Sequence, residues 1–345
     1  MKIIIDIGHP AHVHLFKNFA IEMQKKGHVI LFTCREKEFE IKLLQAEGFE
    51  YISLGHHYKS VGGKAFGLLK FNLKLLNIAR KFQPDVFLSS GSMYAAQVSA
   101  LLRRPHIALE DTENMEQIWL YKPFTKLILT PDAIPQKYGR KQLRYKGFHQ
   151  SAFLHPNYFK RDVDFKRKLS ISSNERVFLL RMVALNATHD LKVPGLSKDQ
   201  VLKLINILEN KGRLFISSEK PLVNGLEKYS LNIAPENIHD FISICDLVIG
   251  ESSTMSNEAG YLGVPNIFIE DINLNVLNRY SELGLKIHFK ELDDERLKEV
   301  ELIVSNIAEY KEKFERNSKV FINNSIDLTA YLVDLFESKK FIKNV

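Results

Sequence analysis

This sequence has few cysteines, no long apolar run and only a small excess of positive over negative charge. Its 345 residues include only Cys34 and Cys245, too few for a disulfide scaffold or a zinc ribbon. Because no stretch of about 18 apolar residues occurs, we expect no membrane-spanning helix. The first apolar run, within MKIIIDIGHP, is too short for a signal-peptide core. These shortages predict a cytoplasmic protein whose thiols stay free and buried.

Motifs of several common function classes are also missing. The chain has 48 Lys and Arg against 41 Asp and Glu, a net charge of +7, but this charge is spread along the sequence. No compact basic and aromatic motif of a nucleic-acid-binding module occurs, so we expect no nucleic-acid partner. No G-x-G-x-x-G run opens either half, which argues against a dehydrogenase. A mildly basic protein still suits smaller anions, such as nucleotides or lipid head groups.

Short β-branched runs alternate with helical patterns in both halves of the chain. In the first half we predict strands at 2–7, 28–34, 50–54, 85–89, 105–109 and 126–130, and helices at 12–26, 36–47, 66–82 and 93–102. In the second half we predict strands at 176–181, 213–217, 247–249 and 265–269, and helices at 197–211, 239–245, 254–262 and 274–283. A connector is expected over 147–175, and charged helical patterns at 292–318 and 326–340 complete the chain.

This alternation predicts an α/β fold with two doubly wound, Rossmann-like parallel-sheet domains that face a cleft. We expect an N-terminal domain over 1–150, a C-terminal domain over 151–325, and a C-terminal helix over 326–345 that packs back on the N-terminal domain. A single large domain and two unrelated Rossmann-like units are the alternatives. Because ligands of such sheets bind beyond the carboxyl ends of the strands, function should lie in the loops that follow them.

The most informative loop lies in DLVIGESSTMSNEAGYLGVP, residues 246–265. A strand ends there, and Ser252, Ser253 and Thr254 open a helix. Such hydroxyls cap free backbone N–H groups, and the same helix end can bind an anion such as a diphosphate. Glu258 lies one turn further, well placed to hold a ribose diol. The alternative is an ordinary capped helix with an exposed glutamate.

Three histidines crowd the loop after the first strand, GHPAHVHLF at 8–16. At a helix amino end the pKa of His12 should be lowered, so that it could accept a proton near neutral pH; His14 is the second candidate. A zinc site is another explanation for the three histidines, but His12 and His14 lie two positions apart and cannot share a helical face. With no carboxylate or cysteine complement nearby, we expect no metal. The remaining alternative is that these histidine rings are structural, and only cap the helix and pack against their neighbours.

Hydroxyl and carboxylate side chains follow two later strands. Ser92 closes a serine and glycine turn that could contact sugar hydroxyls. A cluster at the next strand end, a candidate acid/base set, consists of Glu110, Asp111, Glu113 and Glu116. We take Glu110 as a candidate catalytic group and Glu113 as an acceptor or sugar contact.

Arg181, at the end of the first strand of the second half, could bind two diphosphate oxygens with its guanidinium fork. An ordinary surface ion pair is the alternative. The long loop that follows, 182–196, offers further candidate substrate contacts in Asn186, His189 and Asp190.

Residues 250–265, GESSTMSNEAGYLGVP, resemble the nucleotide-sugar signature of B-type glycosyltransferases and that of non-hydrolysing UDP-N-acetylglucosamine 2-epimerases. The resemblance implies that Ser252, Ser253 and Thr254 hold the diphosphate and that Glu258 holds the ribose. It also implies that Ile238, in the run NIHDF, lies near the base of the nucleotide.

Two loops of the first half resemble parts of these families less completely. Residues 8–14 resemble the G-x-G-G-H-x-x-P loop of the peptidoglycan N-acetylglucosaminyltransferase, with His12 in the place of its histidine. Pro10-Ala11 replaces the glycine pair, which weakens a phosphate role for the loop. In the 2-epimerase pattern Glu110 matches one catalytic carboxylate, whereas Gly91-Ser92-Met93 lacks the aspartate of the other. The missing carboxylate argues against a standard 2-epimerase.

As a whole, the chain resembles the family known as domain of unknown function 354. The runs that carry this resemblance are D-x-x-x-P-x-H-V-H at 6–14, S-x-G-S at 89–92, D-T-E at 111–113, L-T-P at 129–131 and the 250–265 segment. They span both halves, so the resemblance implies the two-domain fold. It implies no activity, because the family name carries none.

The leading hypothesis is a glycosyltransferase that uses a UDP-sugar as substrate, needs no further cofactor and acts on a glycan or lipid-linked acceptor. The donor would bind at Arg181 and Glu258, and the acceptor near His12, Ser92 and Glu110. A nucleotide-sugar 2-epimerase or hydrolase is the second hypothesis, and a non-catalytic nucleotide-sugar binder is the third.

Residues 59–82 suggest a peripheral contact with the inner face of the cell membrane. The segment has no acidic residue; its cations are Lys59, Lys64, Lys70, Lys74, Arg80 and Lys81, and its predicted apolar stripe is Phe66, Leu69, Leu73 and Leu76. Such a helix suits an anionic lipid surface. A sheet-covering helix with a solvated basic face is the alternative.

Overall fold

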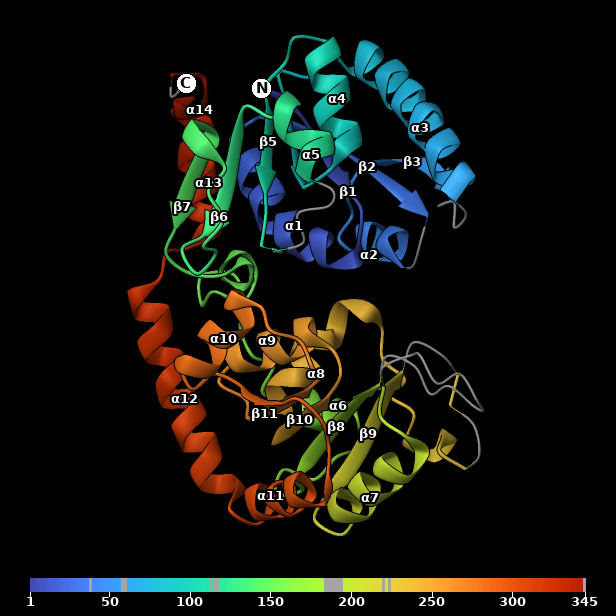
Figure 1. The fold of residues 1–345 in the computed structure, drawn as a ribbon, viewed down its shortest axis with the longest axis vertical. Coiled ribbons are helices and arrows are strands. Elements are labelled where there is room, and N and C mark those ends of the chain that lie inside the picture. The colour runs from blue at the N-terminus through green and yellow to red at the C-terminus, as the bar shows by residue number, and fades with distance from the viewer. Residues whose placement is uncertain are drawn as a thin grey trace. The chain divides into compact units, whose positions relative to one another are not determined.

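The computed structural model describes residues 1–36, 39–56, 61–111, 113, 118–182, 195–218, 221–222 and 225–343. The chain divides into two units, shown in Figure 1. Unit 1 consists of Met1–Tyr158 and Ser325–Val345, and unit 2 consists of Phe159–Asn324. Each unit has its own parallel sheet and its own core.

Unit 1 is built on seven parallel strands in the order β3-β2-β1-β4-β5-β6-β7. The strands are β1 (Lys2–Ile7), β2 (Val29–Glu36), β3 (Tyr51–His56), β4 (Val86–Ser90), β5 (His106–Leu109), β6 (Leu127–Pro131) and β7 (Gln142–Tyr145). The helices are α1 (Pro10–Lys25), α2 (Glu40–Ala46), α3 (Val61–Phe82), α4 (Met93–Leu101), α5 (Ile118–Tyr121), α13 (Leu328–Glu337) and α14 (Lys340–Lys343), with 3-10 turns η1 (Lys122–Phe124), η2 (Gly139–Lys141) and η3 (His149–Ala152). The strand order reverses between β1 and β4, so the topological switch point lies there.

The centre of this sheet is covered by helices. All four isoleucines of β1 are fully buried. Ile4 belongs to one apolar cluster with Phe71 and Leu75 of α3 and Ala95 of α4. This burial explains why β1 is a nearly continuous apolar run rather than an alternating one.

The end of the chain belongs to unit 1, where α13 packs against α1 and η3. Asn18 Nδ2 and Thr329 Oγ1 both donate to the main-chain oxygen of Ala152, at 2.9 and 2.8 Å. These bonds hold the segment after β7 in unit 1, so the first unit ends at Tyr158. The boundary predicted after residue 150 is corrected accordingly, because contacts with distant helices hold a segment that has no periodicity of its own.

Unit 2 has five parallel strands in the order β12-β11-β10-β8-β9. The strands are β8 (Val177–Met182), β9 (Arg213–Ser218), β10 (Leu247–Gly250), β11 (Asn266–Ile269) and β12 (Ile287–Phe289). The helices are α6 (Phe165–Lys168), α7 (Lys198–Glu209), α8 (Ile238–Ile244), α9 (Ser253–Tyr261), α10 (Asn275–Glu282), α11 (Asp294–Ser305) and α12 (Ile307–Asn324), with η4 (Glu227–Tyr229) and η5 (Pro235–Asn237). One apolar cluster of this unit includes Phe178 and Leu180 of β8, Leu204 of α7 and Val300 of α11.

Three features differ from the elements predicted by periodicity. Strands β7 and β12 were not predicted, because runs such as QLRY and IHF are too short to show a period. The pattern over 292–318 proves to be part of two helices, since α11 ends before Asn306 and α12 starts after it. None of the described helices is long and apolar enough to cross a lipid bilayer.

Candidate functional site

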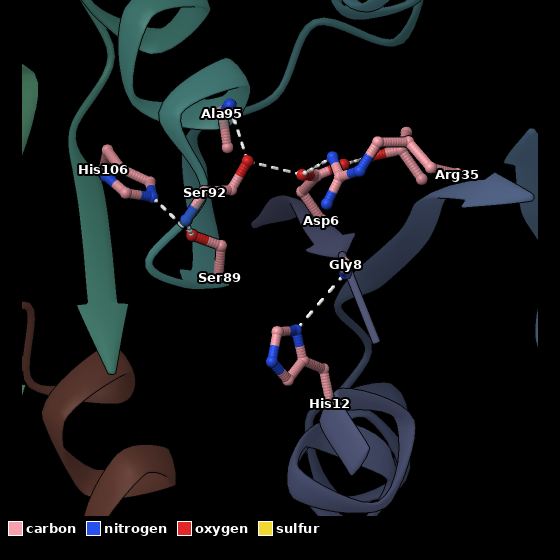
Figure 2. Close-up of polar contacts among 9 residues, drawn as sticks. Asp6, Gly8, His12, Arg35, Ser89, Ser92, Ala95 and His106 are labelled. Atoms are coloured by element: carbon pink, nitrogen blue, oxygen red, sulfur yellow. Dashed lines mark hydrogen bonds and ion pairs between the residues drawn. The ribbon is translucent and has the colours of Figure 1, made fainter. Parts of the chain in front are cut away.

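Unit 1 buries a carboxylate at the carboxyl end of β1, as Figure 2 shows. Thr33 Oγ1 donates to Asp6 at 2.7 Å, and Ser92 Oγ donates to it at 2.5 Å. Arg35 Nη1 donates to the same carboxylate at 3.1 Å, and its guanidinium lies 4.7 Å from the ring centroid of Tyr94. Asp6 therefore ties β1 to β2 and to the start of α4, and Arg35 matches its buried charge.

Ser92 caps α4 with the hydroxyl that was expected to contact a sugar. This hydroxyl donates to Asp6 and accepts the N–H of Ala95 at 3.2 Å (Figure 2). Its side chain is buried. The single hydroxyl proton is thus used inside the protein, so Ser92 positions the turn, and any sugar contact would have to use its second lone pair.

A directional chain of hydrogen bonds holds the same turn. The N–H of Ser92 donates to Ser89 Oγ at 3.0 Å, and Ser89 Oγ lies 2.9 Å from His106 Nε2 (Figure 2). Thr125 Oγ1 gives its own proton to the main-chain oxygen of Tyr121 at 2.8 Å, so it accepts from His106 Nδ1, and the neutral ring accepts the Ser89 proton at Nε2. His106 Nδ1 then donates to Thr125 Oγ1 at 2.9 Å. Burial lowers the pKa of His106 to about 3, so the ring is neutral in this chain.

His12 lies at the start of α1 and faces the loop that follows β1. The N–H of Gly8 donates to His12 Nδ1 at 3.2 Å (Figure 2). Burial, the nearby His9 and Arg35 lower the pKa of His12 to about 3, although Asp111 opposes them. A neutral ring that accepts at Nδ1 carries its proton on Nε2. His12 therefore offers a hydrogen-bond donor to a ligand, which does not favour the expected role as proton acceptor.

The other two histidines of this loop point elsewhere. His9 is the N-cap of α1, and its Nδ1 accepts the N–H of Ala11 at 3.2 Å. His14 is buried, with its ring centroid 5.8 Å from that of Phe153. Within the described part of the chain, no group of three or more His, Cys, Asp or Glu side chains could hold a metal ion. The second candidate for proton transfer, His14, thus packs inside unit 1.

Glu110 is buried just beyond β5. Tyr121 donates its phenol proton to Glu110 Oε2 at 2.5 Å. Gly91 has a φ of +60°, and a Cβ there would lie 2.9 Å from the same oxygen, so the turn after β4 needs glycine. Burial, with Glu110 and Glu113 nearby, raises the pKa of Tyr138 to about 12. The structure thus places Glu110 against Tyr121, with both Glu110 and Glu113 near enough to Tyr138 to raise its pKa.

A histidine that the sequence analysis missed pairs with the next carboxylate. His149 Nδ1 lies 3.0 Å from Asp111 Oδ2, and the ring of Tyr145 stacks on that of His149 with an interplanar angle of 13°. Burial would raise the pKa of Asp111, but His149 and His12 together hold it below its usual value. No local signal marked His149, because the strand before it, β7, was not predicted.

In unit 2, Gly250 lets two strand ends approach closely. Its φ is +153°, and a Cβ there would lie only 1.9 Å from the main-chain oxygen of Arg181, its partner in the sheet register. The same oxygen accepts the N–H of Glu251 at 3.1 Å. Arg181 Nη1 donates to Ser217 Oγ of β9 at 3.1 Å. Arg181 thus lies beside the turn that leads into α9.

The start of α9 has the expected geometry of a helix cap. Ser252 is the N-cap, and its Oγ accepts the N–H of Met255 at 3.4 Å. Ser253 and Thr254 are the first helical residues, and Thr254 is exposed. The N–H groups of a first helical turn carry a partial positive charge and can bind an anion.

Glu258 is buried, with 5% of its surface exposed. It is therefore not the exposed glutamate that an ordinary capped helix would carry. Its Oε1 lies 3.3 Å from Nε2 of His239, which is also buried. His239 directly follows Ile238, the first residue of α8. The structure therefore brings together two residues assigned to the nucleotide, Ile238 and Glu258, and adds His239, which the sequence analysis did not single out. The predicted contacts Asn186, His189, Asp190 and Glu116 lie outside the described residues.

Comparison with known sequences gives a family without an assigned activity. A family model described as protein of unknown function, DUF354, matches residues 1–330. An uncharacterized protein of Methanocaldococcus jannaschii is 22% identical over 309 residues, which cover 85% of this chain and 89% of that protein.

Solved structures share the fold at low identity. A UDP-GlcNAc 2-epimerase from Neisseria meningitidis, bound to UDP-GlcNAc, has a TM-score of 0.63 and 15% identity, over 94% of this chain and 99% of that one. A putative UDP-N-acetylglucosamine 2-epimerase from Listeria monocytogenes has a TM-score of 0.70 and 12% identity, over 98% and 96%. A spinosyn rhamnosyltransferase with spinosyn aglycone has a TM-score of 0.65 and 14% identity, over 98% and 99%. The predicted two-domain fold of B-type glycosyltransferases is confirmed.

The neutral, buried His106 predicts a loss of stability in mild acid. In the unfolded chain a histidine has a pKa of about 6.5, so below that pH the unfolded state takes up a proton that folded His106, with a pKa of about 3, does not. The contribution of neutral His106 to the free energy of unfolding is fully present above pH 6.5. It decreases as the pH is lowered, by roughly 2 kcal/mol at pH 5. Urea unfolding followed by the fluorescence of Trp119, the single tryptophan, measures this in unit 1.

His106→Gln should be less stable at pH 7 yet lose less stability between pH 7 and pH 5 than the wild type. His155→Gln is the matched control, because His155 is also in unit 1 but lies 3.7 Å from Asp327, outside this chain of hydrogen bonds. Equal pH slopes for His106→Gln and the wild type would contradict the assignment.

Proposed function

The chain belongs to the DUF354 family, and from that starting point we propose that it is a glycosyltransferase. It transfers a sugar from a nucleotide-sugar donor, a UDP-sugar in this proposal, to a glycan or lipid-linked acceptor in surface polysaccharide biosynthesis. The fold shared with glycosyltransferases and 2-epimerases supports the class. The observation that carries the proposal is the group formed in unit 2 by the start of α9, Arg181 and Glu258.

These three features match the parts of a nucleoside diphosphate. The first turn of α9 supplies N–H groups for the diphosphate, and Arg181, on the adjacent strand, supplies a guanidinium fork. Because the transferred sugar leaves a diphosphate behind, the same groups stabilise the charge that develops on the leaving group. Glu258, one turn into α9, accepts hydrogen bonds from the ribose hydroxyls, and Ile238 lies at the base.

A 2-epimerase is the second candidate, favoured by one observation in unit 1. Glu110 is a buried carboxylate at the end of β5, the type of group that could move a proton at a sugar carbon. The turn after β4 has Ser92 where the 2-epimerase pattern has its other carboxylate region, and this serine hydroxyl is used by Asp6 and α4. With one carboxylate of the pair missing, transfer is the better supported reaction.

Incubation with UDP-N-acetylglucosamine and a panel of other nucleotide-sugars separates the candidates. A transferase releases the nucleotide faster when an extract of membrane lipids and glycans is added as acceptor. An epimerase changes the sugar of the donor with no acceptor present, and NMR of the recovered nucleotide-sugar detects this. Epimerisation without acceptor-dependent release would overturn the transferase proposal.

Glu258→Ala should weaken the binding of UDP by about 1–3 kcal/mol, because it removes a charged acceptor from the ribose. Isothermal titration calorimetry with UDP measures this directly. Glu312→Ala is the matched control, since Glu312 is an exposed carboxylate of the same unit. An unchanged UDP affinity in folded Glu258→Ala protein means that the ribose contact is wrong.

We also propose that unit 1 contacts the inner face of the cell membrane through α3. In the predicted stripe, the side chain of Phe66 lies outside the described residues and Leu76 is only partly buried. The buried face of α3 carries Phe71, Leu75 and Ala79 instead. Leu69 and Leu73 are consequently 62% and 52% exposed, beside exposed Lys70 and Lys74. Apolar and cationic side chains on one exposed face suit an anionic lipid surface.

The neighbouring helices α4 and α5 also carry exposed apolar side chains. Asn72 of α3 donates to Gln97 of α4 at 2.7 Å, and Gln97 donates to the main-chain oxygen of Leu120 of α5 at 3.1 Å. Leu101 at the end of α4 and Trp119 of α5 are both 69% exposed. In this proposal the lipid surface also contacts Trp119 of α5.

Sedimentation with vesicles of anionic lipid tests this contact. Lys70→Glu with Lys74→Glu should bind more weakly, by roughly 1 kcal/mol per lysine removed, and Trp119→Ser should also bind more weakly. The matched control exchanges two exposed lysines of α12 in unit 2, Lys313→Glu with Lys319→Glu. Equal sedimentation of all variants at low salt favours a soluble acceptor.

A further inference from the structure

We propose that His149, oriented by Asp111, is the group in unit 1 that takes the proton from the acceptor hydroxyl. The inference rests on the transferase function proposed above and adds to it a residue that neither the sequence nor the comparisons assign. It starts from one contact, His149 Nδ1 at 3.0 Å from Asp111 Oδ2, and from the state of the opposite ring nitrogen.

The partner of each ring nitrogen decides what the ring can do. An ionised carboxylate only accepts, and the pKa of Asp111 is held below its usual value, so His149 Nδ1 must carry the proton that Asp111 accepts. When the ring is neutral, Nε2 then has a lone pair and no proton. In the described part of the chain, His149 Nε2 is buried and has no hydrogen-bond partner.

A buried acceptor without a donor is unfavourable, so a ligand hydroxyl that donates to it would be stabilising. The ring cannot turn easily to relieve the cost. Tyr145 stacks on it, and the 3-10 turn that carries it is held by Asn18 and Thr329 through the oxygen of Ala152. His149 is 6% exposed, so few orientations are open to it.

His12 has the opposite arrangement in the same site. The N–H of Gly8 holds its Nδ1, which leaves an N–H donor at Nε2. His149 contributes to the lowered pKa of His12, and both histidines help to lower the pKa of Asp111. One histidine can therefore donate to an oxygen of the bound sugars while the other accepts a proton.

The transfer step balances with these groups. The proton of the acceptor hydroxyl moves to His149 Nε2, and Asp111 stabilises the imidazolium that forms. The electron pair left on the acceptor oxygen forms the bond to the anomeric carbon of the donor sugar. The bond from that carbon to the diphosphate oxygen breaks, and the nucleoside diphosphate leaves with its electron pair. Water later takes the proton from His149.

The tautomers are measurable without any activity. Long-range ¹H–¹⁵N NMR of the histidine rings at neutral pH should show His149 with its proton on Nδ1 and His12 with its proton on Nε2. His149→Gln and His12→Gln assign the signals among the 12 histidines. Asp111→Asn should shift the His149 signals and leave those of His155 unchanged. A proton found on Nε2 of His149 overturns the proposal.

Kinetics test the role itself, with release of UDP from UDP-N-acetylglucosamine in the presence of the membrane extract as the readout. His149→Ala should lower kcat by roughly 10²–10⁴-fold while the KM for the donor stays unchanged, because the donor site lies in unit 2. Added imidazole should restore part of the lost rate, which a merely structural residue would not show. His155→Ala is the matched control and should keep the wild-type rate.

The outcomes of the two measurements are distinguishable. A near-normal kcat in His149→Ala, or a lost rate that imidazole does not restore in folded protein, overturns the assignment of His149. A wild type that shows no acceptor-dependent release counts against the transferase function, and the NMR measurement then still decides whether His149 is built as a proton acceptor.

Discussion

The carboxylate of Asp6 is the point on which unit 1 depends most. It is fully buried at the end of β1, next to the switch point of the sheet, and its charge is matched by Arg35 from β2. Removing one partner of such a buried pair typically costs about 3–5 kcal/mol, because the other charge is left unpaired. The glycine after β1 belongs to the same arrangement, since a Cβ on Gly8 would lie 2.4 Å from Arg35 Nη2. The ion pair of Asp6 and Arg35 thus supports the start of the loop that carries His12.

Four histidines of unit 1 show how partners, and not residue type, assign chemical roles. The ring of His106 relays a hydrogen bond between Ser89 and Thr125, and its lowered pKa keeps it neutral. The backbone N–H of Gly8 makes His12 a donor, whereas the carboxylate of Asp111 makes His149 an acceptor. The ring of His14 packs against that of Phe153 inside unit 1. A donor and an acceptor histidine that both act on Asp111 form a set that can hold one sugar oxygen and deprotonate another.

In unit 2 the constraint is a close approach of backbone. Gly250 has no side chain, and the main-chain oxygen of Arg181 fills that space. This approach brings the Arg181 strand end next to the start of α9, where an anion would meet both a helix terminus and a guanidinium. Glu258, one turn into the helix, is buried with its Oε1 3.3 Å from Nε2 of His239.

The sequence by itself determined the fold class and the elements with a strong period. Alternating strand and helix patterns predicted both parallel sheets, and the run at 250–265 predicted the capped start of α9, because these signals are local and depend only on neighbouring residues. Strands β7 and β12 escaped prediction, since three or four residues show no period and only pairing with a longer strand makes them strands. The same holds for the segment after β7, which Asn18 and Thr329 draw into unit 1.

What only the tertiary structure decided is the state of each candidate side chain. The sequence predicted that His12, Ser92 and Glu110 lie in loops after strands, and the structure has them there. It did not predict the hydrogen bonds that determine what each side chain can donate or accept. The bond from Gly8 sets the tautomer of His12, and Asp6 uses the hydroxyl of Ser92. Asp111 and His149 lie far apart in the sequence and meet only because β5 and β7 end at the same edge of one sheet. A proton's position depends on such neighbours in space, and spacing along a chain does not record them.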